Sequence, residues 1–320
     1  MKRLISFSLA LLLLVGCVGR AASVQEEAQP VQTRVPVSQE AEDAQLSDPE
    51  ADGQTQETPE NPESPEEPED PEAPFAGDPE EPYVRVIDPS KPMVALTFDD
   101  GPHQTYTDAI LDILEANHAV ATFFEVGVNV ARCPEAVVRE QELGCEIGSH
   151  SYAHKNLGKM KKSAILRDLD AADEAFIAAG VGAPNLVRPP YGSVNRSLKY
   201  ETGRTMVTWS IDTEDWRSRD AEKVIAAVQG AANLDGQVIL LHSIYQSTVD
   251  ATEVLVPWLQ EQGYQLVTMT ELMAYYYGQL PEPDTLYSYN FFTRTPRTDT
   301  PLELPEAEPG ESEAEAAPAA

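Results

Sequence analysis

The residues best suited to chemistry in this 320-residue chain lie in five short polar segments. Each segment follows a short apolar run, as expected where a buried strand ends and a loop begins. Three of the five histidines of the chain fall within these segments. Polar residues gathered at strand ends indicate one shared site rather than scattered surface positions. The segments are Thr97–Pro102, His150–His154, Arg188–Gly192, Asp212–Trp216 and Leu240–Ser243.

The first two segments carry the residue types of a metal centre. His150 and His154 at a strand end can turn both imidazoles toward one point, and a nearby carboxylate would complete a three-ligand site with positions left for water. Asp99 and Asp100 are consecutive, so they point to opposite sides unless the strand ends between them and the following turn redirects one. One aspartate would then bind metal while the other acts as a base. Taken alone, the histidine pair fits two surface histidines of a helix equally well.

Short apolar runs alternate with segments of helical periodicity between residues 93 and 278. This alternation is typical of repeated β-α units and a mainly parallel sheet, and it predicts a closed or nearly closed α/β barrel. In such barrels the chemistry lies on loops that leave the C-terminal ends of the strands. Strands are expected at 94–98, 121–126, 146–149, 186–188, 205–211, 237–241 and 265–269, and helices at 105–117, 163–179, 221–232 and 248–262.

The five segments, in this order, resemble the motifs of the polysaccharide deacetylases of the NodB-homology type, carbohydrate esterase family 4. The resemblance covers Lys91–Gly278. It implies a distorted (β/α) barrel, TIM-like, with about seven parallel strands. It also implies a metal-dependent hydrolase that removes acetyl groups from polysaccharides.

The resemblance implies a role for each matching residue. Asp99 matches the catalytic base, and Arg188 matches the arginine that holds this base. His242 matches the general acid, and Asp215 matches its acidic partner. The other matches are the metal ligands Asp100, His150 and His154, the backbone N–H of Tyr191 that faces the oxyanion, and the substrate-binding residues Trp216, Leu240 and Tyr191. The metal is usually Zn²⁺, with Co²⁺, Mn²⁺ or Ni²⁺ as alternatives.

The reaction implied by the resemblance is removal of N-acetyl groups from an amino-sugar polymer. The N-terminal sequence Leu-Val-Gly-Cys predicts a lipid anchor. A membrane-tethered enzyme meets its own cell wall first, which favours peptidoglycan over chitin-like polymers or poly-N-acetylglucosamine. The same residues can serve an O-acetyl esterase on a polymer such as xylan, because an ester is an easier substrate than an amide. A third interpretation is an inactive glycan-binding lipoprotein, but the aspartates and histidines that catalysis needs are all retained. We expect a monomer.

The formal net charge of −32 comes mostly from segments outside this domain. Residues 24–82 contain nineteen acidic residues and one basic residue, and residues 279–320 contain nine and two. The sequence has no basic stripe that could neutralise phosphates, which argues against nucleic acid as a partner. We expect a disordered acidic linker rich in Pro and Glu at 18–82, the deacetylase domain at 83–278 and a mostly disordered acidic, Pro-rich tail at 279–320. Within this tail the aromatic stretch Tyr287–Phe292 can pack back onto the domain.

The N-terminus predicts secretion and a lipid anchor. Lys2 and Arg3 precede an apolar run, Leu4–Val15, that is too short to span a bilayer comfortably and is typical of a signal peptide. The run leads into Leu-Val-Gly-Cys, which resembles a bacterial lipobox whose cysteine, Cys17, is acylated. We therefore expect residues 1–17 to be a lipoprotein signal ending at the lipobox cysteine. The protein would be extracytoplasmic, held to the bacterial membrane only by its lipid anchor and reaching into the cell wall.

Overall fold

The computed structural model describes residues 85–304. The expected signal peptide, the lipobox Cys17 and the acidic linker up to residue 82 lie outside these residues, as does the tail beyond residue 304. Within the described range, no helix is both long enough and apolar enough to cross a membrane.

Strands and helices alternate along the described chain, and the four helices expected from periodicity are all present within a few residues. The elements are β1 (Met93–Asp99), α1 (Tyr106–Ala116), β2 (Thr122–Glu125), α2 (Gly127–Val130), α3 (Pro134–Glu142), β3 (Glu146–Ser149), η1 (Leu157–Lys159), α4 (Lys162–Ala179), β4 (Leu186–Val187), η2 (Pro190–Gly192), α5 (Arg196–Tyr200), β5 (Thr205–Val207), β6 (Ile211–Asp212), α6 (Asp215–Ser218), α7 (Ala221–Gln229), β7 (Gln237–His242), α8 (Gln246–Glu261), β8 (Gln265–Leu266), α9 (Met269–Glu271), η3 (Leu272–Tyr276), β9 (Leu286–Tyr287) and α10 (Tyr289–Arg294).

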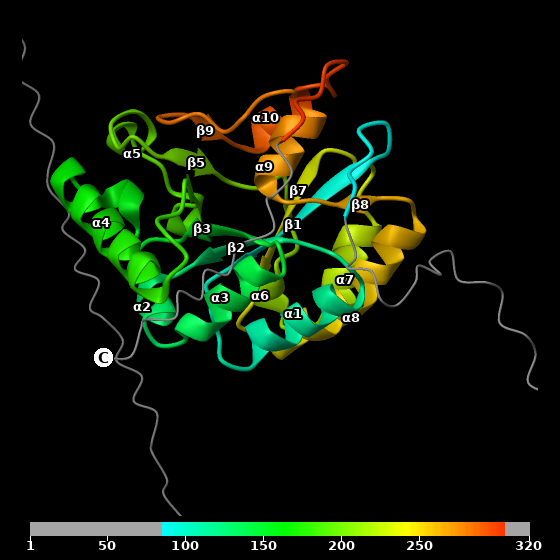
Figure 1. Cartoon of the computed structure of the whole chain (residues 1–320), viewed down its shortest axis with the longest axis horizontal. Coiled ribbons are helices and arrows are strands. Elements are labelled where there is room, and N and C mark those ends of the chain that lie inside the picture. The colour runs from blue at the N-terminus through cyan, green and yellow to red at the C-terminus, as the bar shows by residue number, and fades with distance from the viewer. Residues whose placement is uncertain (1–84, 305–320) are drawn as a thin grey trace, which may run out of the picture. The chain divides into compact units, whose positions relative to one another are not determined.

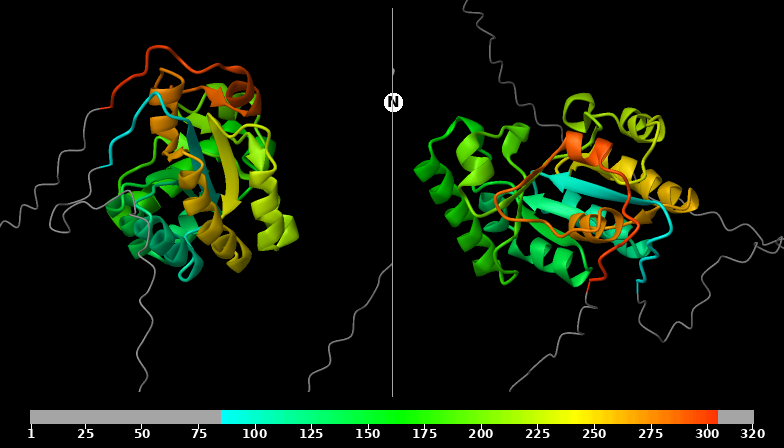
Figure 2. Two further views of the ribbon diagram at one scale, coloured as in Figure 1. Left: turned by 90° about the vertical axis from the view of Figure 1, so that its right-hand side faces the viewer. Right: turned by 90° about the horizontal axis from the view of Figure 1, so that it is seen from above.

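The strands form one sheet in the order β6-β7-β1-β2-β3-β4-β5-β9, and β8 also pairs with β1. All of these pairs are parallel. The helices cover both sides: Figure 1 shows α1, α3, α7 and α8 on one side of the strands and α9 and α10 on the other, and Figure 2 shows the same layers from two further directions. The sheet is a distorted half-barrel, which confirms the predicted fold class.

The two faces of β1 show how this fold places chemistry. Every residue of β1 is at most 2% exposed, so both faces are buried, as is usual in a parallel sheet. One face runs from Val94 to Phe98 and packs in the same core as α1, α7 and α8. The other face begins at Met93, in the core formed with α9, η3 and α10, and ends in Thr97 and Asp99. Because side chains alternate along a strand, Met93, Ala95, Thr97 and Asp99 share one face. This face is therefore apolar at the start of β1 and polar at its end.

The single strand expected at residues 205–211 is wrong. β5 pairs with β4 and β9, whereas β6 pairs with β7 at the other end of the strand order. Between them the chain crosses from one end of the sheet to the other. The Thr208 N–H donates to the Tyr287 carbonyl and the Ser210 N–H donates to the Val238 carbonyl, both at 2.9 Å. A run of buried residues indicates extended chain but does not reveal a change of partner strand.

The domain also continues past the boundary expected at residue 278. The Met206 N–H donates to the Thr285 carbonyl at 2.8 Å, which attaches β9 to the edge of the sheet. Tyr287 and Phe292 are only 4% and 2% exposed in the core. The expectation of a mostly disordered tail is therefore corrected for residues 279–304, because the aromatic residues bury surface that the surrounding Pro and acidic residues do not.

Candidate active site

The structure brings the predicted metal ligands together at the C-terminal ends of β1 and β3. Asp100 directly follows β1, and His150 directly follows β3. Their ligand atoms and that of His154 all lie within 4.8 Å of one another. Asp100 Oδ1 is 3.4 Å from His150 Nε2 and 3.1 Å from His154 Nε2. One carboxylate and two imidazoles converging on a point make a donor set of the kind that binds Zn²⁺ and similar ions.

Neighbouring groups prepare these ligands for a cation. His150 Nδ1 lies 2.7 Å from the Arg188 carbonyl, which accepts its hydrogen and leaves Nε2 as the nitrogen that faces Asp100. Burial lowers the pKa of His150, which keeps the ring neutral at neutral pH. Burial raises the pKa of Asp100, but the hydrogen bond with His154 and the charges of the histidines outweigh it and lower this pKa to about 2. An ionised carboxylate beside an unprotonated Nε2 fits a divalent metal.

The second aspartate is held apart from this cluster by a buried arginine. Arg188 Nη1 donates to Asp99 Oδ1 at 2.8 Å and to Thr97 Oγ1 at 2.7 Å. Arg188 Nη2 donates to the Thr208 carbonyl, and the guanidinium lies 4.0 Å from the Phe124 ring centroid. Arg188 is completely buried, and Asp99 is 2% exposed. These contacts fix one carboxylate oxygen of Asp99 and leave Oδ2, which is 3.7 Å from His150 Nε2, toward the cluster.

On the other side of β1, His242 and Asp215 form a second pair. β7 carries His242 at its end and pairs with β1, so that His242 is in register with Asp99. His242 Nδ1 lies 2.8 Å from Asp215 Oδ1. Asp215 is completely buried and also accepts from the His242 backbone N–H and from Thr248 Oγ1, both at 2.8 Å. Burial lowers the pKa of His242, but the hydrogen bond and charge of Asp215 outweigh it and raise the pKa.

Strained backbone gathers around these groups. Eight residues other than glycine have positive φ in the described chain, and six of them lie in the loops that form or border the site. Tyr191, with φ 63°, has a backbone N–H that finds no acceptor within residues 85–304. An unpartnered N–H beside the ligand cluster is the geometry expected of an oxyanion donor. The six residues are Asp100, Ser151, His154, Tyr191, Glu214 and Arg219.

These side chains line one cleft of about 480 Å³. The predicted site residues that reach it are Asp99, Asp100, His150, His154, Tyr191, Trp216, Leu240 and His242, while Arg188 and Asp215 are buried behind it. The sequence analysis assigned no role to Asp212, although this residue begins the fourth polar segment, and it did not predict Trp209, Arg219 and Tyr245; all four line the cleft. Trp209 lies in the crossing between β5 and β6, and a continuous strand was expected there. Arg219 and Tyr245 lie just beyond the fourth and fifth polar segments.

An acidic pair beneath the site was also missed. Glu125, the last residue of β2, and Glu140 of α3 are completely buried. Their carboxyl oxygens have no hydrogen-bond donor among the described residues beyond a proton that the two can share. Burial, together with nearby negative charge, raises the pKa of each well above its ordinary value. A Cβ at Gly101 would lie 2.7 Å from Glu125 Oε2, so this pair also requires a glycine directly after Asp100.

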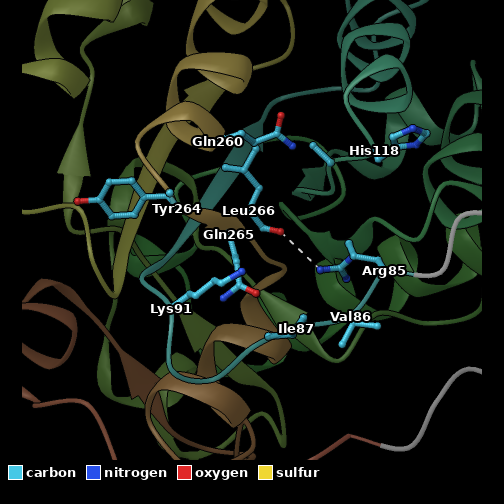
Figure 3. Close-up of a pocket in the computed structure, with 11 residues that line it drawn as sticks. Arg85, Val86, Ile87, Lys91, His118, Gln260, Tyr264, Gln265 and Leu266 are labelled. Carbon is cyan, nitrogen blue, oxygen red and sulfur yellow. Dashed lines mark hydrogen bonds between the residues drawn. The ribbon is translucent and has the colours of Figure 1, made fainter. Parts of the chain in front are cut away.

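A second hollow, of about 360 Å³, lies at the opposite ends of the strands (Figure 3). It lies beside the start of β1, where Met93 pairs with Gln265 of β8. Figure 3 shows Arg85 and His118 on one side of it, with Arg85 Nη1 3.5 Å from the Leu266 carbonyl. None of its lining residues is acidic, and within residues 85–304 the one cluster of three metal-binding side chains is in the cleft. The cleft is therefore the candidate active site.

This half-barrel carries an Asp-His-His cluster beside buried Asp–Arg and His–Asp pairs at its strand ends, an arrangement suited to metal-assisted hydrolysis. The polysaccharide deacetylase family profile matches residues 87–208. The chain is 36% identical over 190 residues to a peptidoglycan-N-acetylglucosamine deacetylase of Bacillus cereus, which covers 57% of this chain and 69% of that protein. The chain belongs to the polysaccharide deacetylase family.

Other relatives extend this comparison. The chain is 36% identical over 191 residues to the peptidoglycan-N-acetylmuramic acid deacetylase PdaC of Bacillus subtilis, covering 60% of this chain but only 41% of that protein. The solved structure of Bacillus subtilis PdaC matches with a TM-score of 0.58 at 36% identity, over 59% of this chain and 93% of that chain. A family 4 acetyl xylan esterase from Clostridium thermocellum, solved with a cobalt ion, matches with a TM-score of 0.56 at 30% identity, over 61% and 97%.

Proposed function

We propose that the protein is a metal-dependent deacetylase that removes N-acetyl groups from peptidoglycan. The observation that carries this proposal is that a metal-ligand cluster, a separate carboxylate and a histidine all line one cleft. These are the groups that hydrolysis of an amide needs: a Lewis acid, a base for water and an acid for the leaving nitrogen.

Asp100, His150 and His154 would hold the divalent ion, with Zn²⁺ first and Co²⁺, Mn²⁺ or Ni²⁺ as alternatives. When bound, the ion polarises the acetamide carbonyl and lowers the pKa of water in the cleft. The chemistry of the donor set supports this assignment, since Asp100 is ionised and His150 is neutral at neutral pH.

The remaining groups would move the protons. Asp99 accepts a proton as water attacks the carbonyl carbon, and Arg188 keeps the Asp99 carboxylate in place. The Tyr191 N–H donates to the oxyanion that forms, an interaction worth about 3 to 4 kcal/mol per donor in comparable sites. His242, kept protonated by Asp215, gives its proton to the nitrogen as the C–N bond breaks. The products are acetate and a free amine on the sugar.

The proposed substrate rests on the relatives and on the aromatic residues at the opening of the cleft. The relatives from Bacillus subtilis and Bacillus cereus are named for N-acetylmuramic acid and N-acetylglucosamine of peptidoglycan. The opening of the cleft carries two exposed aromatic side chains, Tyr191 at 67% and Trp216 at 46% exposure. Exposed rings of this kind suit the apolar faces of sugars.

The direct test is acetate release by the full-length protein from purified peptidoglycan, chitin oligomers and acetylated xylan. We expect release from peptidoglycan that stops when EDTA is added and returns with Zn²⁺. Asp99→Asn, assayed beside the wild type, controls for contaminating esterases. Absence of acetate from every substrate with metal present would refute the proposal.

A second candidate is an O-acetyl esterase, favoured by the 30% identity with the acetyl xylan esterase from Clostridium thermocellum. The same cleft would serve it, because an ester needs the same base and a weaker acid. Release from acetylated xylan alone, with none from peptidoglycan, would establish this activity in place of the first.

We also propose that the protein is a lipid-anchored, extracytoplasmic enzyme attached through Cys17. The support for this proposal is the N-terminal sequence, in which an apolar run leads into Leu-Val-Gly-Cys. The test is fractionation of cells that express wild-type protein or Cys17→Ala. We expect the wild type in the membrane fraction and labelled by radioactive palmitate, and the variant unlabelled. Equal labelling of both proteins would contradict the assignment.

A further inference from the structure

Arg219 is held at the rim of the cleft by two contacts. Its Nε donates to the Trp216 carbonyl at 2.8 Å. Its guanidinium carbon lies 3.3 Å from the ring centroid of Tyr245, in a stacked cation–π arrangement. The backbone adopts the left-handed region, with φ 49°, and the Arg219 N–H donates to the Asp215 carbonyl at 3.0 Å. These contacts hold the exposed Arg219 side chain in one conformation in the absence of ligand.

The charge of Arg219 has no carboxylate partner within residues 85–304. Its two neighbours in sequence with positive charge do have partners: Arg217 pairs with Glu214, and Lys223 pairs with Asp220. The Nη1 and Nη2 atoms of Arg219 make no hydrogen bond with any described residue. The hydrogen bond to Trp216 and the stacking on Tyr245 therefore fix the guanidinium and leave its Nη1 and Nη2 atoms available to a ligand.

Arg219 is also the one lysine or arginine among the described residues that line the cleft. The other ionisable side chains there include Asp99, Asp100 and Asp212, which would repel an anion. A guanidinium edge presents paired N–H groups that match a carboxylate in a bidentate geometry. Arg219 thus gives an anionic substituent on the substrate a cationic partner at the rim that is neither a metal ligand nor the proposed acid His242.

We propose that Arg219, stacked on Tyr245, is a carboxylate-recognition site that selects glycans carrying an anionic group near the reacting acetamide. This inference rests on the proposed function and refines its substrate class. Peptidoglycan offers such a carboxylate either on the lactyl ether of muramic acid or on the attached peptide, whereas chitin is neutral. The site would favour cell-wall strands over uncharged amino-sugar polymers.

The test is equilibrium binding of the full-length protein to three soluble glycan probes: peptide-free peptidoglycan strands, the same strands with methyl-esterified carboxyl groups, and strands that retain their peptides. Arg219→Gln removes the charge and keeps a planar amide. Arg217→Gln is the matched control, because Arg217 is exposed, lies two residues away and does not line the cleft. Tyr245→Leu removes the aromatic face beneath the guanidinium.

We expect Arg219→Gln to raise the dissociation constant for carboxylate-bearing strands by about five- to tenfold more than for esterified strands. Tyr245→Leu should show the same difference at a smaller size, and Arg217→Gln should show none. A selective loss with peptide-free strands identifies the lactyl carboxylate, and one seen only with peptide-bearing strands identifies the peptide carboxylate. Equal losses on free and esterified strands, or no loss on any of the three probes, would overturn the proposal.

The same samples separate this inference from the proposed function. Acetate release by the wild type reports on the deacetylase activity, and the binding ratios report on Arg219. Carboxylate-selective binding without any acetate would refute the activity and keep the recognition site. Acetate release without carboxylate-selective binding would support the deacetylase activity and refute the recognition site.

Discussion

Asp215 accepts two hydrogen bonds from His242, one from the ring Nδ1 and one from the backbone N–H, each at 2.8 Å. The pairing fixes the ring orientation and the tautomer, and it leaves Nε2 as the nitrogen available to the cleft. It also explains why the pKa of His242 is raised although burial alone would lower it. The His242 ring is thereby prepared to be a proton donor at neutral pH.

Replacing Asp215 with Asn should move the alkaline limb of activity toward lower pH. In the proposed mechanism activity requires protonated His242 and is lost as the pH rises through the pKa of this histidine, so removing the charge that raises the pKa shifts that loss downward. We also expect the rate at pH 7 to fall by roughly 10² to 10⁴. The measurement is kcat/KM for acetate release between pH 5 and 10. An unchanged pH profile in Asp215→Asn would exclude this pairing from catalysis.

Thr248→Val is a milder change at the same site as Asp215→Asn. Thr248 Oγ1 donates to Asp215 Oδ2 at 2.8 Å and does not line the cleft. Losing this one donor leaves the charge of Asp215 in place. The alkaline limb should therefore move much less than in Asp215→Asn, and a shift of equal size would mean that the charge of Asp215 is not its cause.

The two consecutive aspartates should separate experimentally into different roles. Asp99→Asn should stop turnover and leave metal bound, because Arg188 holds Asp99 Oδ1 and only Oδ2 approaches the cluster, 3.7 Å from a single histidine nitrogen. Asp100→Asn should lose metal, because Asp100 Oδ1 faces both histidines. Metal content per protein, measured beside acetate release, distinguishes them. Loss of metal in Asp99→Asn with retention in Asp100→Asn would show that the assignments are reversed.

Breaking the Arg188–Asp99 pair should cost stability as well as activity. Arg188→Met leaves the Asp99 carboxylate buried without its partner, and removing one member of a buried pair typically costs about 3 to 5 kcal/mol. Urea unfolding measures this cost. Adding Asp99→Asn to Arg188→Met should recover part of it, because the uncompensated charge is then gone. No recovery in the double variant would show that the cost comes from lost packing of Arg188 on Phe124.

Glu140→Gln should stabilise the protein at alkaline pH. Burial raises the folded-state pKa of Glu125 and Glu140, so the folded state binds more protons than the unfolded state, and the free energy of unfolding falls as pH rises above about 4.5. An amide at residue 140 supplies an N–H to Glu125 without a proton from solvent. We expect a gain of about 1 to 3 kcal/mol at pH 8 and less at pH 5.

Glu142→Gln is the control for that prediction, because Glu142 is exposed at the end of the same helix. Urea unfolding of both variants at pH 5 and pH 8 gives the comparison. A Glu140→Gln variant that is less stable than wild type at pH 8 would show that the buried pair holds a negative charge favourably.

Much of the site could be predicted because its residues follow strands directly. Parallel strands end at a common edge, so Asp100 after β1 and His150 after β3 must approach each other once the strand order is known. Positive φ at Asp100 confirms the expectation that the chain turns between the two aspartates. This turn explains why the two carboxylates point apart, whereas the assignment of Asp99 as base and Asp100 as ligand rests on the family resemblance.

The parts that the sequence did not predict depend on contacts between segments that are far apart in the chain. Such contacts leave no local pattern in the sequence. Trp209 reaches the cleft only because the chain crosses between β5 and β6, and Arg219 is positioned by Tyr245 from a different loop. Glu125 and Glu140 look like ordinary surface acids in sequence, and only packing places them together. The fold beyond residue 278 was predicted only in part, because β9 and the short helix α10 are held by aromatic burial rather than by periodicity.

The central claim is that Asp100, His150 and His154 bind one divalent ion, and anomalous X-ray diffraction from crystals grown with Zn²⁺ tests it most directly. We predict one anomalous peak in the cleft, about 2.0 to 2.2 Å from an Asp100 oxygen and from both Nε2 atoms. The peak should vanish in Asp100→Ala crystals grown in the same way. A zinc peak elsewhere, with none touching these three residues, would contradict the account.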